Sequence, residues 1–261
     1  MEGLLFPLLV LLGGTVLLVM GLIKSGRARA YKKIPCVPAG SPAGGERRFI
    51  SGKAHSPVQA GAPVSKAACV FYLEKIDRKE PNYSRQGGDA DHWVRRENNV
   101  YGAFFLRDGS GAALVVPTAV SVDLSKPEAS ESDDLPLSGG NSGAVRKSEL
   151  IISEGETVTV LGAPGTLGEF LQYLRQNTDR SLPSDLLAEL LRLEKEPGSS
   201  ALPCYFGDGI ERVSDRAHAE YIAGTASSGA FLLQLGALLA AGGAVFLVYA
   251  LKLFGGGAAD L

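Results

Sequence analysis

The sequence predicts a membrane protein in which two transmembrane helices flank a small antiparallel β-rich (α+β) domain, barrel-like or sandwich-like, with a helical pair. An uncharged run of membrane-spanning length lies near each end of the chain. Between the runs, short apolar segments are separated by turn signals, which is typical of an all-β core rather than of alternating strands and helices. Two leucine-rich segments follow late in the central region and predict the helical pair.

The first uncharged run extends from Leu4 to Ile23, and residues 1–23 are expected to form the N-terminal transmembrane helix. A bilayer core about 30 Å thick needs roughly 20 apolar residues in a helix. A cleaved signal peptide is the alternative, because Ala28-Arg29-Ala30 fits an A-x-A cleavage pattern. An uncleaved anchor is favoured, since the run is longer than the roughly 7–15 apolar residues of a signal peptide and no basic residue precedes it.

The second uncharged run extends from Ala230 to Leu251, with Gln234 as its one strongly polar residue. Residues 227–254 are therefore expected to form the C-terminal transmembrane helix, followed by a short tail, 255–261. Both runs contain glycine, and Gly236 with Ala240 has the small-xxx-small spacing that lets helix backbones approach closely. Helix pairing or a homo-oligomer through these glycine-rich helices is one interpretation. The other, which we favour slightly, is that glycine is simply common in membrane helices.

A basic flank and linker, residues 24–46, separates the first run from the domain. Its first ten positions contain five basic residues and no acidic one, namely Lys24, Arg27, Arg29, Lys32 and Lys33. Because such flanks stay in the cytoplasm, we expect a multi-pass protein of the cell membrane with its soluble domain on the cytoplasmic face. The lipid bilayer is thus one expected partner, and the basic residues suit anionic headgroups.

The soluble domain is expected to span residues 47–226. Asp108-Gly109-Ser110-Gly111 is a turn signal that predicts a β-hairpin. Expected strands cover Arg47–Ala54, Ala67–Ile76, Val100–Arg107, Ala112–Val116 and Thr157–Leu161. Six side chains are expected in the core, namely Phe71, Leu73, Phe104, Leu106, Val115 and Val160. The single tryptophan, Trp93, is also expected in the core rather than at a partner surface.

Two further segments complete the domain. Residues 124–148 are rich in acidic, Ser, Pro and Gly residues and predict a disordered loop, because they cannot bury enough apolar surface to offset their ordering entropy. The helical pair is expected at 166–196. Thr166 and Glu169 form a capping-box pattern at the start of the first helix. The leucine stripe of the second helix predicts packing on the sheet in preference to the membrane surface.

The sequence offers no coherent catalytic or metal-binding set, so we assign no catalytic, cofactor-binding or metal residue and expect no cofactor. The charge balance, 26 basic against 28 acidic residues, argues against nucleic acid as a partner. Gly140–Ala144 comes closest to a nucleophile elbow, but within the expected loop. Gly162–Gly168 resembles a phosphate-binding loop, but no parallel strand is expected after its helix. No zinc-site spacing relates the six candidate ligands, which are Cys36, Cys69, Cys204, His55, His92 and His218.

The order of these segments resembles the GIDE-type domain of mitochondrial E3 ubiquitin ligases, which lies between two membrane helices. The matching segments are Ser65–Leu73, Trp93, Phe104–Gly111, Val115–Pro117, Glu154-Gly155 and Val158–Gly162. The resemblance implies a membrane-adjacent recognition module. A RING finger follows the second span in those ligases, but the nine residues from Leu253 to Leu261 contain neither Cys nor His.

We therefore expect a membrane-anchored binding or scaffold protein with an unidentified protein partner. The alternative is a RING-type E3 ubiquitin ligase-like protein. It is disfavoured because a RING holds two zinc ions with about eight ligands, whereas the chain has three cysteines and three histidines. The resemblance also places the domain on the extracytoplasmic side, opposite to the side that the basic flank predicts.

Overall fold

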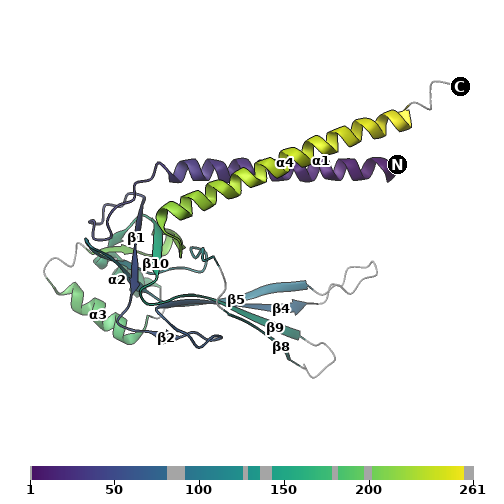
Figure 1. Ribbon diagram of the computed structural model, residues 1–261. Helices are drawn as coiled ribbons and strands as arrows, with labels where there is room; N and C mark the ends of the chain where they lie inside the picture. The colour runs from purple at the N-terminus through teal and green to yellow at the C-terminus, as the bar shows by residue number, and fades with distance from the viewer. Residues whose placement is uncertain are drawn as a thin grey trace. The chain divides into compact units, whose positions relative to one another are not determined.

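The computed structural model describes residues 2–80, 92–125, 129–135, 143–177, 182–196 and 202–255. The chain forms two compact units, one made of Met1–Ile34 with Ala219–Leu261 and the other of Pro35–His218. The first is a pair of helices and the second is a mixed α+β domain. Each unit is described by itself (Figure 1).

The helical unit consists of α1 (Glu2–Tyr31) and α4 (His218–Gly255). Both helices are long and apolar enough to cross a membrane, because mean hydropathy reaches 2.5 over an 18-residue stretch within Leu5–Tyr31 and 2.2 over one within His218–Lys252. The helices expected from the two uncharged runs are therefore present. Both continue as helix past the runs: α1 beyond Ile23, and α4 upstream of Ala230.

The two helices run in opposite directions and contact each other through glycines (Figure 1). A Cβ atom added to Gly14 would lie 2.4 Å from the backbone nitrogen of Ala240, and one added to Gly236 would lie 2.6 Å from that of Leu18. The backbones can approach this closely only because these positions lack side chains. The glycines thus pair the helices of one chain.

The buried positions of both helices recur every seven residues. Within the described side chains they include Pro7, Gly14, Gly21 and Ala28 on α1, and Ile222, Gly229, Gly236, Gly243 and Ala250 on α4. A repeat of seven keeps one face of each helix toward its partner when the two wind around each other with a left-handed twist. The opposite faces expose large apolar side chains such as Leu9, Val19 and Phe246, as expected for contact with lipid.

The domain contains a seven-stranded sheet with the order β11-β12-β7-β6-β1-β10-β13. Its neighbours are antiparallel except for β12 and β7, which are parallel. No barrel closes among the described residues, because β11 and β13 end the sheet without pairing with each other. The strands are β1 (Arg48–His55), β6 (Phe104–Asp108), β7 (Gly111–Val115), β10 (Thr157–Gly162), β11 (Gly165–Thr166), β12 (Pro203–Tyr205) and β13 (Ile210–Ser214).

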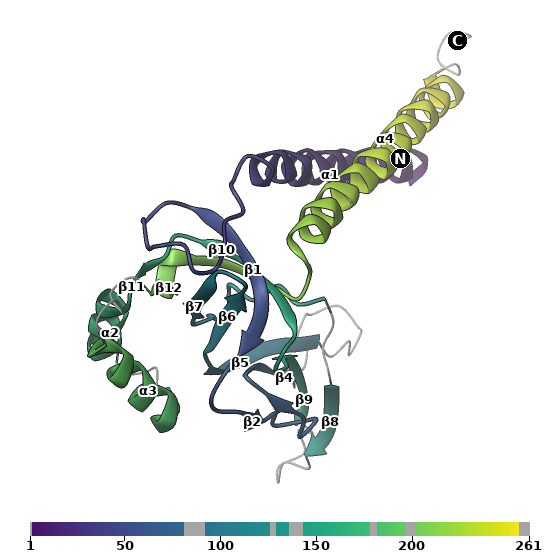
Figure 2. The same cartoon turned by 60° about the vertical axis from the view of Figure 1, so that its left-hand side comes forward.

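A second, four-stranded antiparallel sheet has the order β5-β4-β9-β8. It extends from the seven-stranded sheet as an arm (Figures 1 and 2). Its strands are β4 (Phe71–Glu80), β5 (His92–Gly102), β8 (Ala129–Leu135) and β9 (Gly143–Ile152). A two-residue pair, β2 (Ala60–Gly61) with β3 (Ala68–Cys69), precedes β4.

The hydrophobic core lies on both faces of the seven-stranded sheet. One cluster joins this sheet to the near end of the arm and contains all six expected core residues, each with no exposed side-chain area: Phe71, Leu73, Phe104, Leu106, Val115 and Val160. The other cluster lies under α2 (Leu167–Gln176) and α3 (Ser184–Glu194), where Phe170, Leu186 and Leu190 are fully buried. Leu186 and Leu190 of the α3 leucine stripe therefore belong to the core, as expected, whereas Leu191 is exposed.

Local signals explain several of these elements. The expected hairpin is formed by β6 and β7, and the Asp108 carboxylate accepts hydrogen bonds from the backbone nitrogens of Ser110 and Ala39, both at 2.8 Å. The capping box is present at the start of α2, where the side chain of Thr166 accepts from the Glu169 nitrogen and the Glu169 carboxylate accepts from the Thr166 nitrogen.

The structure differs from the sequence-based expectations in two regions. The segment 124–148, expected to be a disordered loop, contains β8 and the first part of β9, because pairing with neighbouring strands supplies hydrogen bonds that composition does not reveal. The expected strand 100–107 is divided at Ala103. Gly102 has a φ of +93°, and a Cβ there would lie 2.4 Å from the Val70 oxygen, so the chain turns sharply between the two sheets at a residue without a side chain.

Candidate functional site

One face of the four-stranded arm carries apolar core side chains at the end near the seven-stranded sheet and charged side chains farther out. The register places Lys75 and Asp77 of β4 on the same face as the core residues Phe71 and Leu73, since side chains alternate along a strand. Asp77 faces Arg95 of β5 on one side and Arg146 of β9 on the other. We call the set Lys75, Asp77, Trp93, Arg95, Asn98 and Arg146 the arginine face.

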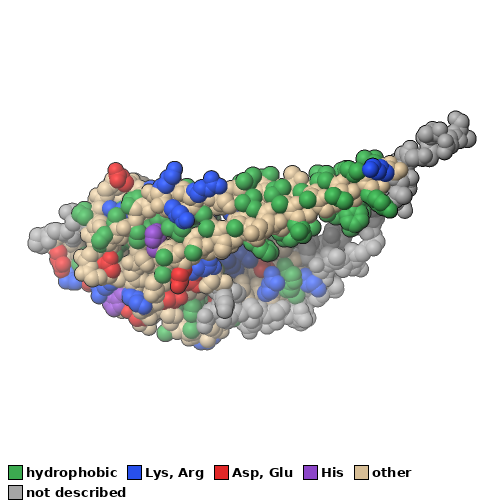
Figure 3. Space-filling view, turned by 45° about the horizontal axis from the view of Figure 1, so that its top comes forward, with side chains coloured by type: hydrophobic (Ala, Val, Ile, Leu, Met, Phe, Trp, Pro, Cys, Tyr) green, Lys and Arg blue, Asp and Glu red, His purple; other side chains and the backbone are tan. Residues whose placement is uncertain are grey.

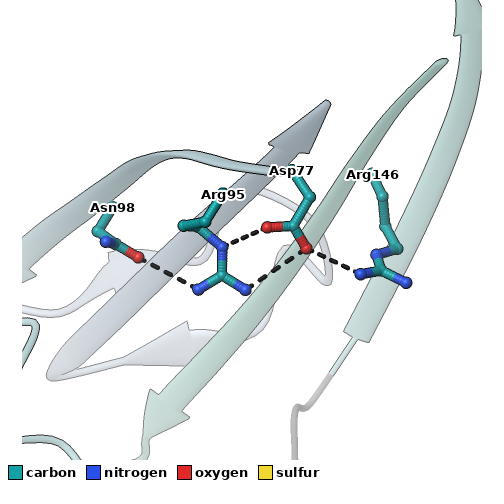
Figure 4. A network of polar contacts seen from close by, with 4 residues as sticks. All are labelled: Asp77, Arg95, Asn98 and Arg146. Atoms are coloured by element: carbon teal, nitrogen blue, oxygen red, sulfur yellow. Dashed lines mark hydrogen bonds and ion pairs between the residues drawn. The ribbon is translucent and has the colours of Figure 1, made fainter. Parts of the chain in front are cut away.

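Asp77 joins the three strands of the arginine face through its carboxylate (Figure 4). Arg95 donates from Nε to Oδ1 and from Nη2 to Oδ2, the latter at 3.4 Å. Arg146 donates from Nη2 to Oδ2 at 2.9 Å. The Asp77 side chain is 5% exposed, whereas the two arginine side chains are 43% and 44% exposed, so a buried anion holds two cations at the surface.

The charge of Asp77 is stabilised by these partners. Hydrogen bonds from Arg95 lower the pKa of Asp77 below its ordinary value, and those from Arg146 act in the same direction against the effect of burial. Burial and the charge of Arg95 lower the pKa of Lys75. Asp77 therefore remains ionised at neutral pH and fixes the orientation of both guanidinium groups.

Trp93 completes the arginine face, because the Cζ atom of Arg146 lies 4.9 Å from the centre of the Trp93 ring. This distance fits a cation–π contact. Trp93 lies on β5 and is half-buried, so the expectation that it belongs to the core is wrong. Its ring packs against the exposed Arg146, and neither hydrophobic core cluster of the described residues includes it.

The two buried cysteines, Cys69 and Cys204, have raised thiol pKa values. Burial, assisted by the charge of Glu149, raises the pKa of Cys69 to about 11, and burial, assisted by Glu169, raises that of Cys204 to about 12. Both thiols stay protonated near neutral pH and are therefore poor nucleophiles. Cys36 is exposed, and partial burial raises its pKa as well.

The glycine-rich loop before α2 already uses its polar groups internally. The Thr166 nitrogen, which would face a phosphate at the start of the helix, donates to Glu169 at 2.7 Å. A Cβ on Gly162 would lie 2.2 Å from the Gly209 oxygen, so this glycine lets the end of β10 approach the short 3-10 helix Gly207–Gly209 that precedes β13. The loop is thus a turn and a helix cap, as expected. The elbow-like segment 140–144 lies mostly outside the described residues.

One cavity of about 500 Å³ lies beside the turn after β9. Its lining includes the acidic residues Glu154, Glu156 and Asp215. Glu154 contacts the His55 ring and accepts from the Ser56 nitrogen at 3.0 Å, and the Ser125 nitrogen donates to Asp215 at 3.0 Å. Across the part of the chain that the structure describes, no three His, Cys, Asp or Glu side chains are grouped to hold a metal ion.

The sequence does not identify Asp77, Arg95 and Arg146 as a group. Arg95 is 18 residues and Arg146 is 69 residues from Asp77 in the chain, and the three meet because β4 pairs with both β5 and β9. The seven-residue spacing of the small helix residues is present in the sequence, and it marks the helix contacts more completely than the four-residue spacing of Gly236 and Ala240.

The comparisons with known proteins give no relative for this chain. No family model matches it, and neither a curated protein nor a solved structure matches it. The resemblance to the GIDE-type domain therefore stays a prediction from the sequence.

Proposed function

We propose that the chain is a membrane-anchored binding or scaffold protein, whose helix pair holds the domain at a bilayer and whose arginine face receives a protein partner. The observation that carries this proposal is the alignment of the two uncharged runs. Gly14 lies against Ala240 and Gly21 against Leu233, so the run from Leu4 to Ile23 lies beside the run from Ala230 to Leu251. Two aligned runs of about 20 residues match the thickness of one bilayer.

The helix pair places the domain on one side of the membrane in this proposal. Pro35–His218 lies between the two helices in the chain, and the helices run in opposite directions, so both connections leave the bilayer at the same surface. The basic residues between Lys24 and Lys33, at the end of α1 and just after it, favour the cytoplasmic side for that surface. We therefore propose a multi-pass protein of the cell membrane with a cytoplasmic domain.

The arginine face has the composition of a protein-binding surface. Tryptophan and arginine are over-represented among the residues that carry the binding energy of protein interfaces. Asp77 holds both arginine side chains in place before a partner arrives, which lowers the entropy lost on binding. Arg146 uses only Nη2 on Asp77, so its other donors can reach a partner.

The GIDE-type resemblance agrees with a recognition module beside a membrane, but ligase activity has no support in the described residues. The three cysteines do not form a site: Cys36 is exposed, and Cys69 and Cys204 are buried in separate parts of the domain. We therefore propose binding rather than ubiquitin transfer as the activity.

Photo-crosslinking in native membranes tests the binding proposal. A photoreactive amino acid at Asn98, an exposed member of the arginine face, is expected to give a discrete protein adduct in the full chain. The substitutions Arg95→Gln and Arg146→Gln are each expected to remove that adduct. Arg47→Gln is the matched control, because Arg47 is a similarly exposed arginine that pairs with Glu211 on another sheet at 2.5 Å.

Two results would contradict the proposal. An adduct that survives both arginine substitutions would show that the arginine face does not select the partner. The absence of an adduct at Asn98, in membranes where the folded protein is present in normal amount, would show that this face is unoccupied. Release of the wild-type chain from membranes by alkaline carbonate would separately contradict the anchorage.

A further inference from the structure

The packing of α1 against α4 defines where the hydrocarbon layer ends. Gly21 contacts Leu233, and a Cβ on Gly229 would lie 2.9 Å from the backbone nitrogen of Ser25. Lys24 is therefore level with the start of the uncharged run at Ala230. Hydrophobic side chains form a band along the helices, and Lys and Arg side chains appear where the band ends (Figure 3).

Beyond this level the two helices stay together for another two turns. Ala28 is 3% exposed, and the rings of Tyr31 and Tyr221 are 5.9 Å apart. At about 1.5 Å per residue, Lys24 to Tyr31 spans about 10 Å, which is enough to cross the headgroup layer of about 5–8 Å on one side of a bilayer. Tyrosine is also enriched at this depth. The segment is thus a rigid helix at the height of the headgroups.

The stretch from Lys24 to Lys33, which adds the turn residues Lys32 and Lys33 to the end of α1, carries five basic side chains. All five are exposed, and none forms an ion pair within the described part of the chain; they are Lys24, Arg27, Arg29, Lys32 and Lys33. Some exposed arginines of the domain are paired instead, since Arg47 binds Glu211 and Arg192 binds Glu189 and Glu196. The neighbouring stretch of α4, from Ala219 to Gly229, offers a single carboxylate, Glu220.

We propose that the segment Lys24–Lys33 is a binding site for anionic phospholipid headgroups in the leaflet on the domain side. The inference rests on the proposed membrane anchorage and adds a lipid class to it. Each basic residue near an anionic surface attracts its headgroups, and the attraction falls within a Debye length. Because α4 packs against the end of α1, Lys24, Arg27 and Arg29 stand at headgroup depth on an ordered helix, which lowers the backbone entropy lost on binding. A lipid headgroup and free phosphate both offer a phosphate group to these cations. The apolar part of α1 before Lys24 favours a lipid, because it can also contact the acyl chains.

Quenching by brominated lipids tests the proposal on the full chain. The reporter is Leu22→Trp in a Trp93→Phe background, because Leu22 is 59% exposed and lies just before Lys24 on the apolar part of α1. The protein is reconstituted with dibrominated phosphatidylglycerol or dibrominated phosphatidylcholine, and the relative binding constant is obtained from the two quenching curves. We expect a several-fold preference for the anionic lipid, which decreases at high salt.

Two matched controls locate the preference. A reporter at Leu9, which is 58% exposed and lies about 20 Å along the helix from Lys24, is expected to show no preference. Substitution of all five basic residues by Gln is expected to remove the preference at Leu22, whereas Lys252→Gln, at the far end of α4, is expected to leave it unchanged.

The remaining outcomes overturn the proposal. Equal quenching of the Leu22→Trp reporter by both lipids, or a preference that survives the five Gln substitutions, would show that the segment does not bind anionic headgroups. Loss of the preference in millimolar inorganic phosphate, but not in chloride of equal ionic strength, would reassign the site to free phosphate. Absence of quenching by either lipid would contradict the membrane anchorage itself, and the lipid site with it.

Discussion

Replacing Gly14 by Ala should weaken the helix pair, whereas replacing its neighbour Gly13 should not. A Cβ on Gly14 would lie 2.4 Å from the Ala240 nitrogen, while ordinary contacts begin at 3.4 Å, so the backbones must separate by about 1 Å. A Cβ on Gly13 has no atom within 4 Å. Overpacking of this kind costs about 1–3 kcal/mol. Both substitutions gain the same helix propensity, about 1 kcal/mol, which cancels in their difference.

The assay is the free energy of separating the helices in mixed micelles. Donor and acceptor dyes on cysteines introduced at Leu9 and Val245, two exposed positions, report the distance between α1 and α4 as SDS is added. The Cys36→Ser background removes the exposed native thiol. We expect Gly14→Ala to be less stable than Gly13→Ala by about 1–3 kcal/mol.

A second pair of neighbouring glycines repeats the comparison on the other helix. A Cβ on Gly243 would lie 2.7 Å from the Leu11 nitrogen, whereas Gly242 has open space. The same order of stability is expected, with Gly243→Ala below Gly242→Ala. If both pairs differ by less than about 0.5 kcal/mol, which is the range of substitutions that touch nothing, the glycine contacts do not hold the helices together.

Three further predictions concern the domain. Phe104→Ala should lower the free energy of unfolding by about 3–5 kcal/mol, because Phe104 is fully buried, and a loss below about 1 kcal/mol in chemical denaturation would place it outside the core. The pKa of Asp77 is lowered in the folded state, so the ionised carboxylate stabilises the folded domain. This contribution is complete above the ordinary pKa of 3.8 and is lost as the pH falls through the lower folded pKa. The stability difference between wild type and Asp77→Asn should therefore be constant near neutral pH and shrink in acid, and a difference that stays constant down to pH values well below 3.8 would refute the role of the Arg95 pairing. In right-side-out vesicles, a membrane-impermeant maleimide should leave Cys36 unlabelled until detergent is added. Labelling of Cys36 in intact vesicles would place the domain outside. Cys69 should stay unlabelled even in detergent until the domain unfolds, because it is buried.

The elements that the sequence predicts well are those with strong local signals. The two long helices follow from uncharged runs, and the β6–β7 hairpin follows from four turn residues between apolar segments. The start of α2 follows from Thr166 and Glu169, whose side chains satisfy backbone groups three residues apart. In each case the determining contacts lie within a few residues, or the bilayer length alone sets the requirement.

The elements that the sequence does not predict depend on distant partners. β12 has only three residues and is held by β7 and β11, so no periodicity could reveal it. β8 consists of residues that favour disorder by composition, and it pairs with β9. The arginine face likewise exists only through strand pairing, since Asp77 meets Arg95 and Arg146 across two ladders.

The helix glycines lie between these cases. Their spacing of seven is present in the sequence, but it does not show which of two adjacent glycines faces the partner. The structure separates Gly14 from Gly13, and Gly243 from Gly242, because only one member of each pair meets a backbone of the other helix.

The most direct test of the central claim, that α1 crosses a bilayer beside α4, is a depth profile along α1. Spin labels are placed one at a time at the exposed positions Leu12, Val19, Leu22 and Arg27 of the reconstituted full chain in the Cys36→Ser background, and collisions with oxygen and with a water-soluble nickel complex are compared. Oxygen contact should dominate at Leu12 and decline through Leu22, and the nickel complex should dominate at Arg27, because the uncharged run ends at Ile23. Dominant contact with the nickel complex at all four positions would show that the helix lies in water and would contradict the account.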